Sequence, residues 1–390
     1  MMKPSRRALF PTIATALTVA FVFLVAGCGG GDDETSSEVD QAAGETTETP
    51  EAAEAADEAE TTEPDVETPE AIEPGATVRL LTHDSFSVSD GLFDNFTLET
   101  GIDVEVVNAG DAGELVSRAI LTAGQPEADV LFGVDNTFLQ RALDADIFTA
   151  YESAGLADVP DDLELDPENR VTPIDYGDVC LNYWKDALDG DPPAGMADLT
   201  RPEFASTFVT MDPEASSPGF AFLLATIATY GPDGWQDYWR QLADGGVTVT
   251  SGWTDAYYGE FVAGGGDKAI VTSYATSPVA EMVFATSDIE EPPTGVVADS
   301  CFRQIEFAGV LAGTENPEAA GALIDFMLSE TFQADIPLNM FVFPANSTLE
   351  PPPSFVEWAT EVDDPLILSP AEIEENRSRW TEEWAEIVLR

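Results

Sequence analysis

The stretch FVTMDPEASSPGFAFLLATIATY, residues 208–230, carries the pattern that decides the fold. Its first four residues, Phe208–Met211, form an apolar run typical of a short buried strand, and residues 218–230 are apolar over the length of a helix. Ser217 suits the N-cap of that helix and Pro218 suits its first turn. A strand followed by a capped helix is the repeating unit of an α/β domain with a parallel sheet.

The same unit recurs on both sides of this stretch. Strands are expected at 78–81, 102–107, 128–132, 208–211, 247–250, 270–274 and 305–312. Helices are expected at 92–99, 111–121, 136–143, 218–230, 254–263, 317–328 and 370–389. These two successive blocks predict an α/β fold of two lobes, each a mostly parallel sheet flanked by helices. A ligand cleft is expected between the lobes, beyond the carboxyl ends of the strands.

The charge of the chain is strongly negative. Its 390 residues include 74 Asp and Glu against 15 Lys and Arg, a formal net charge of −59. Such a chain repels phosphates, which argues against nucleic acid as a partner. Self-repulsion of this size is screened by salt, so a halophilic or salt-tolerant source is expected. One histidine, His83, and three cysteines argue against a Cys/His zinc site and most Ser-His-Asp machinery.

The N-terminus has the pattern of an export signal. Residues 1–7 are basic, residues 8–24 are nearly all apolar, and small residues precede Cys28. This order predicts a signal peptide over 1–27, and its end resembles a lipobox in which Cys28 is lipidated. A transmembrane anchor is the alternative, but the apolar run is short and Pro11 interrupts it. The route of export, general secretory or twin-arginine, stays open.

Residues 28–75 form a second distinct segment. They contain 17 Asp and Glu, no Lys or Arg and few large apolar side chains. Such a segment cannot bury enough surface to offset its ordering entropy, so we expect a disordered acidic tether. The folded body is then expected over 76–390, exported and held at the outer face of the cell membrane or in the periplasm.

Polar groups at the ends of strands are the candidate ligand contacts. Asp111, Ser217 and Ser277 each stand at the start of a helix that follows a strand, where free N–H groups suit an anion. A plain helix cap explains each of them equally well. Trp253 ends another strand without an apolar partner at helical spacing, and an exposed Trp face attracts cations and flat rings.

Six short motifs occur in an order that a known family shares. They are THDSF at 82–86, ADVLFGVDN at 128–136, DYG at 175–177, DPEASSPG at 212–219, VTVTSGW at 247–253 and SYATSP at 273–278. Together they resemble the thiamine-binding substrate-binding proteins of ABC importers, and the resemblance covers about 78–390. It implies the two-lobed periplasmic-binding-protein fold of type II, in which the chain crosses between lobes at a hinge. Lobe 1 is expected at 76–176 and 302–345, and lobe 2 at 177–301 and 346–390.

The resemblance also implies the ligand contacts and their roles. It places contacts at Asp111, Ala112, Ser216, Ser217, Trp253, Tyr274, Ala275, Thr276, Ser277 and Pro278, and also at His83 and Phe341, which together with Ala112 depart from the family pattern. Thiamine has a cationic thiazolium and a flat aminopyrimidine, so Trp253 and Tyr274 can stack on it and Asp111 can meet its positive or amino end. Asp111 as a pure helix cap stays open. Phosphorylated thiamine could accept hydrogen bonds from Ser216, Ser217, Thr276 and Ser277.

The function implied is that of a solute-binding lipoprotein that delivers thiamine, its monophosphate or its pyrophosphate to the permease of an ABC importer. We expect a monomer with no cofactor and no metal beyond the bound ligand. Iron(III) is an alternative ligand because Tyr257 and Tyr258 could form a tyrosine pair, and a cationic polyamine is another. An enzyme is not expected, because the sequence contains no G-x-S-x-G, H-E-x-x-H or Walker pattern.

Two cysteines remain once Cys28 is lipidated. In the family, the segments that contain Cys180 and Cys301 cross between the lobes side by side. An exported protein meets an oxidising setting, so a disulfide between these two cysteines is expected. Two buried thiols are the alternative.

Overall fold

The structure is a computed structural model that describes residues 75–390. The predicted signal peptide, the predicted lipidation site at Cys28 and the predicted tether, as far as residue 74, lie outside the described residues. Within the described range, no helix has both the length and the apolar character needed to cross a bilayer.

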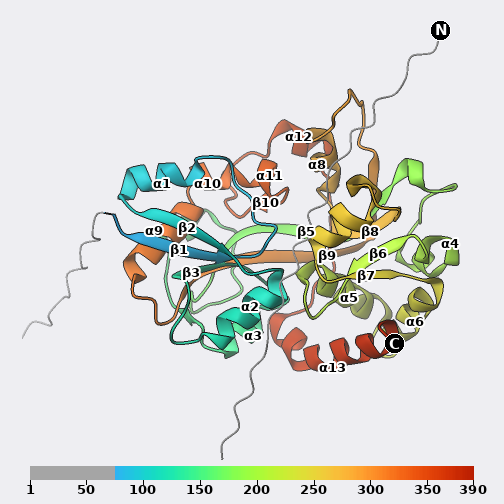
Figure 1. Cartoon of the computed structure of the whole chain (residues 1–390), viewed down its shortest axis with the longest axis horizontal. Helices are drawn as coiled ribbons and strands as arrows, with labels where there is room; N and C mark the ends of the chain where they lie inside the picture. The colour runs from blue at the N-terminus through green and yellow to red at the C-terminus, as the bar shows by residue number, and fades with distance from the viewer. Residues whose placement is uncertain (1–74) are drawn as a thin grey trace, which may run out of the picture. The chain divides into compact units, whose positions relative to one another are not determined.

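Two long antiparallel strands, β5 (Thr172–Trp184) and β9 (Thr294–Leu311), run through both lobes. They lie at the centre of a ten-stranded sheet in the order β2-β1-β3-β9-β5-β8-β6-β7, and the short strands β10 and β4 pair with β5 and β9. Figure 1 shows β5 and β9 passing from one half of the sheet to the other. The lobes are therefore parts of one sheet, connected by two continuous strands.

The first lobe builds its sheet from three parallel strands on one side of β9, and two short strands pair antiparallel with β9 and β5. Its short strands are β1 (Thr77–Thr82), β2 (Asp103–Asn108), β3 (Val130–Asp135), β4 (Phe148–Thr149) and β10 (Phe343–Pro344). Its helices are α1 (Leu92–Thr100), α2 (Ala112–Leu121), α3 (Leu139–Asp144), η1 (Ala154–Asp158), α9 (Pro317–Met327), α10 (Glu330–Gln333) and α11 (Ile336–Asn339). β1 pairs in parallel with both β2 and β3, as the alternation of strand and helix predicts.

The second lobe repeats this arrangement on the other side of β5. Its strands are β6 (Phe208–Met211), β7 (Thr248–Thr250) and β8 (Ile270–Tyr274). Its helices and helical turns are η2 (Lys185–Ala187), η3 (Met196–Thr200), α4 (Pro202–Ala205), α5 (Ser217–Tyr230), α6 (Trp235–Gly245), α7 (Trp253–Asp255), η4 (Ala256–Glu260), η5 (Val262–Gly264) and α8 (Ser277–Val283). Helix α5 is buried from Ser217 to Ile227 because it packs under the sheet, against β9 and β5. Its apolar surface on all sides follows from that position.

The two strands exchange partners where they cross between the lobes. On the first-lobe side, β5 pairs with β10 through Asp175 and Tyr176, and on the second-lobe side it pairs with β8 from Val179 onward. Between these points Asp178 lies opposite Arg303, and their side chains form an ion pair at 2.7 Å. Just beyond this pair the structure joins Cys180 to Cys301 in a disulfide, which links β5 to β9.

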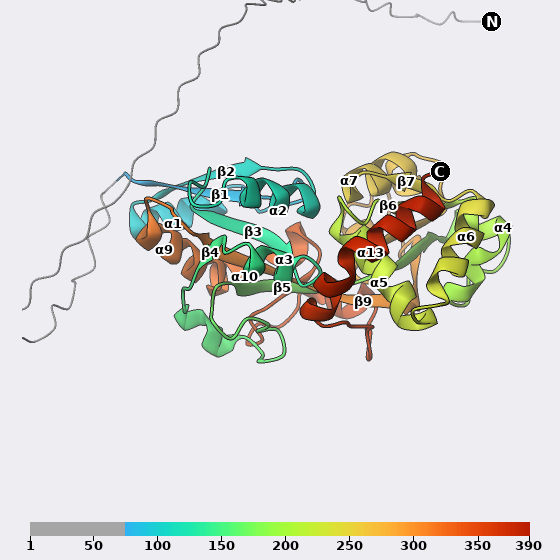
Figure 2. The same cartoon turned by 90° about the horizontal axis from the view of Figure 1, so that it is seen from below.

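The C-terminal helices pack at the boundary between the lobes. Helix α12 (Pro353–Trp358) lies against α8, and α13 (Pro370–Val388) lies against both α6 and α3. The guanidinium of Arg377 on α13 lies 4.0 Å from the ring centres of both Phe138 and Phe220, which come from different lobes. Residues 346–390, expected in lobe 2, therefore also contact lobe 1, and Figure 2 shows α13 lying along the second lobe with one end at the boundary between the lobes.

The predicted helix at 254–263 is wrong as a single element. Three short turns replace it, because the backbone of Phe261 leaves the helical path and forms a β-bridge with Lys268. The hydrogen bonds from Lys268 N to Glu260 O and from Val262 N to Lys268 O hold that bridge. As a result the loop after β7 folds back on itself beside Trp253.

Candidate ligand-binding site

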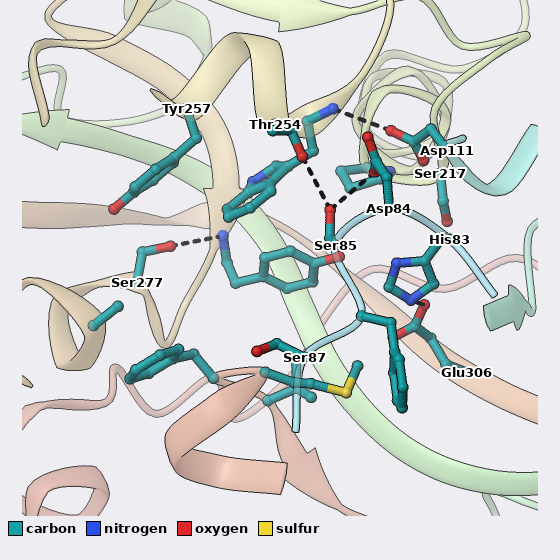
Figure 3. A pocket seen from close by; sticks show the side chains of 18 of the residues that line it. His83, Asp84, Ser85, Ser87, Asp111, Ser217, Thr254, Tyr257, Ser277 and Glu306 are labelled. Atoms are coloured by element: carbon teal, nitrogen blue, oxygen red, sulfur yellow. Dashed lines mark hydrogen bonds and ion pairs between the residues drawn. The ribbon is translucent and has the colours of Figure 1, made fainter. Parts of the chain in front are cut away.

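A cavity of about 420 Å³ lies between the lobes, a size typical of small-molecule sites. It is lined from the first lobe by the loop after β1, the start of α2 and the segment after α11, and from the second lobe by α5, α7, η4 and α8. Residues of β8 and β9 form the rest of its wall. Figure 3 shows side chains from both lobes pointing into this space.

Most of the residues expected at the site line this cavity. Those that do are His83, Asp111, Ala112, Ser217, Trp253, Tyr274, Ser277 and Phe341. The expected residues that do not line it are Ser216, Ala275, Thr276 and Pro278. Each of these four is buried behind the wall: Ala275 packs against the disulfide, for example, and the hydroxyl of Thr276 donates to the carbonyl of Phe341. The strand ends were therefore located correctly, although not every neighbour at a strand end faces the cleft.

The second lobe contributes an aromatic wall. The ring of Trp253 stacks on Tyr257 with centroids 5.0 Å apart, and Tyr274 lies 6.4 Å from it in an edge contact. The indole N–H of Trp253 donates to Ser273 Oγ at 3.1 Å, which fixes the orientation of the ring. The hydroxyl of Tyr257 donates to Glu281 at 2.6 Å and holds the stack from behind. A rigid wall of this kind suits a flat or cationic ring.

Asp111 caps helix α2 and also reaches the other lobe. Its Oδ1 accepts from Ala112 N at 2.6 Å, and its Oδ2 accepts from Trp253 N at 3.0 Å. Burial raises the pKa of Asp111 to about 6, although hydrogen bonds from these N–H groups and from Ser216 favour the ionised form and lower it. Both carboxylate oxygens are thus already hydrogen-bonded to the protein.

Further hydrogen bonds join the lobes around the cavity. The hydroxyls of Ser85 and Thr254 lie 3.3 Å apart, and Figure 3 marks this contact with a dashed line. The hydroxyl of Ser217 donates to the carboxylate of Asp135 at the end of β3. Since these contacts need the lobes to be close together, the structure represents a closed arrangement of the cleft.

The floor of the cavity contains a histidine and buried carboxyl groups. Nε2 of His83 lies 3.5 Å from Oε1 of Glu306, and Glu306 lies directly opposite Asp175 on the paired strand. Burial lowers the pKa of His83 to about 4, so this imidazole is neutral at physiological pH. Burial raises the pKa of Asp175 to about 7 and raises that of Glu306 well above its usual value, and the nearby acidic groups raise the pKa of Glu306 further.

Gly133 makes room for His83. It lies at a bulge of β3 with φ +103°, and a Cβ built there would lie 2.2 Å from Cδ2 of the imidazole. Both the backbone angle and the close approach of the ring require glycine at this position. The depth of the floor therefore depends on the absence of a side chain at residue 133.

Of the four hydroxyls expected to bind a phosphate, those of Ser217, Thr276 and Ser277 form hydrogen bonds within the protein, and that of Ser216 is buried outside the lining of the cavity. Ser217 donates to Asp135 and accepts from Gln304 Nε2 at 2.8 Å, while Ser277 Oγ lies 2.8 Å from Ser273 Oγ and accepts from Tyr274 N. Among the described residues that line the cavity there is no Lys or Arg, whereas Asp84, Asp111 and Glu306 are present. The site as built therefore suits a cation better than an anion.

Several lining residues were not identified from the sequence as ligand contacts. Glu306 and Gln304 lie inside β9, which the sequence shows only as the apolar stretch 305–312. Tyr257 and Tyr258 were considered only as iron ligands, yet both line the cavity beside Trp253. No group of three or more His, Cys, Asp or Glu side chains in the described part of the chain is arranged to hold a metal ion.

Comparison with known proteins agrees with this architecture. Residues 125–361 match the family described as bacterial extracellular solute-binding protein. The thiamine-binding periplasmic protein of Escherichia coli (strain K12) is 31% identical over 315 residues, which cover 79% of this chain and 92% of that protein.

Solved structures extend the match to the fold. A periplasmic thiamin binding protein superposes with a TM-score of 0.73 at 28% identity and covers 83% of this chain and 99% of its own. Iron-bound HitA from Pseudomonas aeruginosa superposes with a TM-score of 0.66 at 20% identity, covering 80% of this chain and 99% of its own, and so shares the fold. The predicted two-lobed periplasmic-binding-protein fold is confirmed, and the chain belongs to the bacterial extracellular solute-binding proteins.

Proposed function

We propose that this protein captures thiamine outside the cytoplasm and delivers it to the permease of an ABC importer. One observation carries the proposal: an aromatic wall faces carboxyl groups across a closed cavity whose described lining contains no Lys or Arg. Thiamine combines a flat aminopyrimidine with a permanent positive charge, so it complements both walls. The similarity to proteins named for thiamine binding supports this choice among ligands of that shape.

The lobes should close on the ligand by rotating about a hinge. β5 and β9 connect the lobes, and the contacts across the cleft come from side chains of both. A ligand that touches both walls favours the closed form only by its additional contacts there. Trp253 and Tyr274 would stack on its rings, while the carboxyl groups of the first lobe and of β9 would face its positive charge.

Free thiamine is the form that this lining favours. Ser217, Thr276 and Ser277 already form hydrogen bonds within the protein, and no cationic side chain of the described lining could balance a phosphate. Bringing a phosphate beside Asp84, Asp111 and Glu306 would add repulsion between like charges. The monophosphate and the pyrophosphate should therefore bind more weakly than thiamine.

Native mass spectrometry of the purified protein tests the proposal. The expected result is a complex with thiamine, and calorimetry should then give one binding site per chain. A protein that carries only a polyamine or only iron, and that fails to bind added thiamine, would contradict it.

Iron(III) is a second candidate because Tyr257 and Tyr258 both line the cavity. Several observations weigh against it. The hydroxyl of Tyr257 donates to Glu281, and burial together with that carboxylate raises its pKa well above 10, which opposes the phenolate that iron needs. Purified protein should be colourless and free of iron by elemental analysis.

Anchoring is proposed from the N-terminal sequence alone. A lipid on Cys28, together with the acidic segment that follows it, would hold the binding protein near its permease at the outer face of the membrane. Replacing Cys28→Ala should release the protein into the soluble fraction without changing its affinity for thiamine. We also propose that it acts as a monomer, which light scattering can test.

Salt tolerance is proposed from the net charge of −59. Repulsion between like charges destabilises the compact state, and salt screens it over about 10 Å at 0.1 M ionic strength. The melting temperature should rise steadily as sodium chloride is increased. A melting temperature that does not depend on salt would contradict a halophilic source.

A further inference from the structure

The carboxyl groups of Asp111, Asp135, Asp175 and Glu306, which lie around the cavity, differ in their hydrogen-bond donors. Asp135 accepts from the backbone and hydroxyl of Thr137, from Phe138 N and from Ser217. Asp111 accepts from two backbone N–H groups. Donors of this kind stabilise a carboxylate, so these two carboxylates are already satisfied by the protein.

Asp175 and Glu306 lack such donors. Asp175 is completely buried, and neither of its carboxyl oxygens has a hydrogen-bond donor among the described residues. Glu306 is 7% exposed and lines the cavity, and it lies beside Asp175 and the imidazole of His83. Nε2 of His83 is itself buried and has no hydrogen-bond partner in the part of the chain that the structure describes. These unpartnered polar groups meet at the floor of the cavity.

The strand register forces the two carboxyl groups together. Asp175 and Glu306 are direct partners on the antiparallel strands β5 and β9, so their side chains lie on the same face with Cβ atoms about 5 Å apart. Two carboxylates this close, in a buried place, cannot both be ionised without a counter-charge. A hydrogen bond between them requires a proton on one of the two.

The charged and titratable groups around the pair do not supply that counter-charge. They are Asp111 from α2, Asp135 from β3, Tyr274 from β8 and His83 from the loop after β1. Arg377 acts on Asp135 and packs between two phenylalanine rings. Among the described residues that line the cavity, none therefore brings a positive charge to the surface that Glu306 presents.

We propose that Glu306, supported by Asp175, is the group that recognises the positive charge of the ligand, and that the pair releases its shared proton to solvent when the ligand binds. This inference rests on the proposed function and assigns the cation contact to Glu306 in place of Asp111. The ligand's charge replaces the proton as the partner of the two carboxylates. Because the proton and the cation compete for the same site, binding should strengthen as the pH rises from 5 to 7.

The two acidic residues should respond differently to substitution. Glu306→Gln removes the negative charge that faces the cavity, so thiamine affinity should fall tenfold or more and proton release should cease. Asp175→Asn removes the competing carboxyl group and gives Glu306 an amide donor, which keeps it ionised. That variant should bind thiamine several-fold more tightly at pH 6 and also release no proton.

Calorimetry with thiamine at pH 6 in buffers of different ionisation enthalpy measures both quantities. Wild type should release between about half a proton and one proton per thiamine bound. Glu105→Gln is the matched control: Glu105 pairs with Arg79 on the exposed face of β2, so the same change of charge there should leave affinity and proton release as in wild type. Circular dichroism of each variant checks that it is folded.

The outcomes separate the two proposals. If wild type binds thiamine without releasing a proton, or if Glu306→Gln binds as tightly as wild type, the inference about the pair is wrong. If Asp111→Asn abolishes binding while Glu306→Gln does not, the cation contact is Asp111. If wild type does not bind thiamine at all, the proposed function fails instead. The proton count on wild type needs no variant, so it decides the question even if a substituted protein does not fold.

Discussion

The carboxylate of Asp111 in the first lobe holds the backbone N–H of Trp253 in the second lobe at 3.0 Å. The same side chain caps α2 through Ala112, so the cap and the contact between lobes are parts of one arrangement. Asp111 therefore positions Trp253, the first residue of the aromatic wall. We therefore expect Asp111 to affect ligand binding mainly by stabilising the closed form of the cleft.

Replacing Asp111→Ala should open the ligand-free protein. The bond to Trp253 is lost, and the radius of gyration from small-angle X-ray scattering should increase. Loss of the cap should also lower the free energy of unfolding by about 1 kcal/mol. Ser329→Ala removes a comparable cap from α10 in the first lobe and should leave the scattering curve unchanged. Equal curves for Asp111→Ala and wild type would show that this bond does not hold the lobes.

Replacing Trp253→Ala should weaken thiamine binding about tenfold or more, which corresponds to about 1.4 kcal/mol or more. The stacking face disappears, while the half-buried position allows the loop to fold. Trp235 is completely buried in the second lobe, so Trp235→Ala should cost about 3–5 kcal/mol of stability with little effect on affinity. Calorimetry and urea unfolding on both variants distinguish the two roles. The site is misassigned if Trp253→Ala binds thiamine like wild type.

Thiamine should bind more tightly than thiamine monophosphate, and the monophosphate more tightly than the pyrophosphate. The described lining contains carboxyl groups without a Lys or Arg, so each added negative charge is repelled. Competition calorimetry at one fixed pH and at high salt gives the three affinities. Tighter binding of either phosphate would mean that the hydroxyls of Ser217 and Ser277 exchange their internal partners for the ligand.

Stability should fall with rising pH through Asp175. Its pKa is about 7 in the folded protein and near 3.8 when exposed, so the folded state holds a proton that the unfolded state loses between these values. The contribution to the free energy of unfolding is therefore present at low pH and is lost as the pH rises toward and through 7. Asp175→Asn should be more stable than wild type at pH 8, by about 1–3 kcal/mol, and should lose most of that advantage at pH 4. Urea unfolding at several pH values checks this, and parallel curves for the two proteins would contradict it.

Removing the disulfide should affect stability much more than binding. The bond between Cys180 and Cys301 links β5 to β9 across a sequence separation of 121 residues, so its loss should cost about 2–5 kcal/mol. Neither cysteine lines the cavity. The double variant Cys180→Ser, Cys301→Ser should therefore change thiamine affinity far less than Trp253→Ala does. A comparable loss of affinity in both proteins would show that the disulfide shapes the cleft.

Sequence patterns identified the lobes and much of the cleft because strand ends have recognisable chemistry. Asp111, Ser217 and Trp253 follow apolar runs directly, and parallel strands bring such ends to the same edge of a sheet. Ser216 and Thr276 share that position in sequence, yet their side chains are buried. Which of two adjacent polar residues faces a cleft depends on packing that a one-dimensional pattern does not contain.

The crossing strands could not be predicted in the same way. β9 is 18 residues long and carries Arg303, Gln304 and Glu306 among its apolar residues. These polar side chains are accommodated because β9 passes from one lobe to the other beside a cavity, so the usual alternation is interrupted. Glu306 therefore seemed to be part of a core strand, and its partner Asp175 belonged to a segment with no clear strand pattern. Asp175 and Glu306 lie opposite each other only because of the register in which β5 pairs with β9, and these strands are far apart in the sequence.

The path of β5 and β9 through both lobes sets the order in which a ligand meets its contacts. If the lobes open by rotation about these strands, Asp111 and Trp253 should separate, whereas Asp175 and Glu306 are paired on the strands themselves and should keep their spacing. An arriving cation should therefore meet Asp175 and Glu306 already side by side on the connecting strands, which would move least as the lobes rotate. The aromatic wall would contact the ligand later, when the lobes close, after the carboxyl pair has oriented it. The carboxyl pair would thus select ligands by charge before the aromatic wall selects them by shape. A cation of the wrong shape should enter the open cleft without stabilising its closed form.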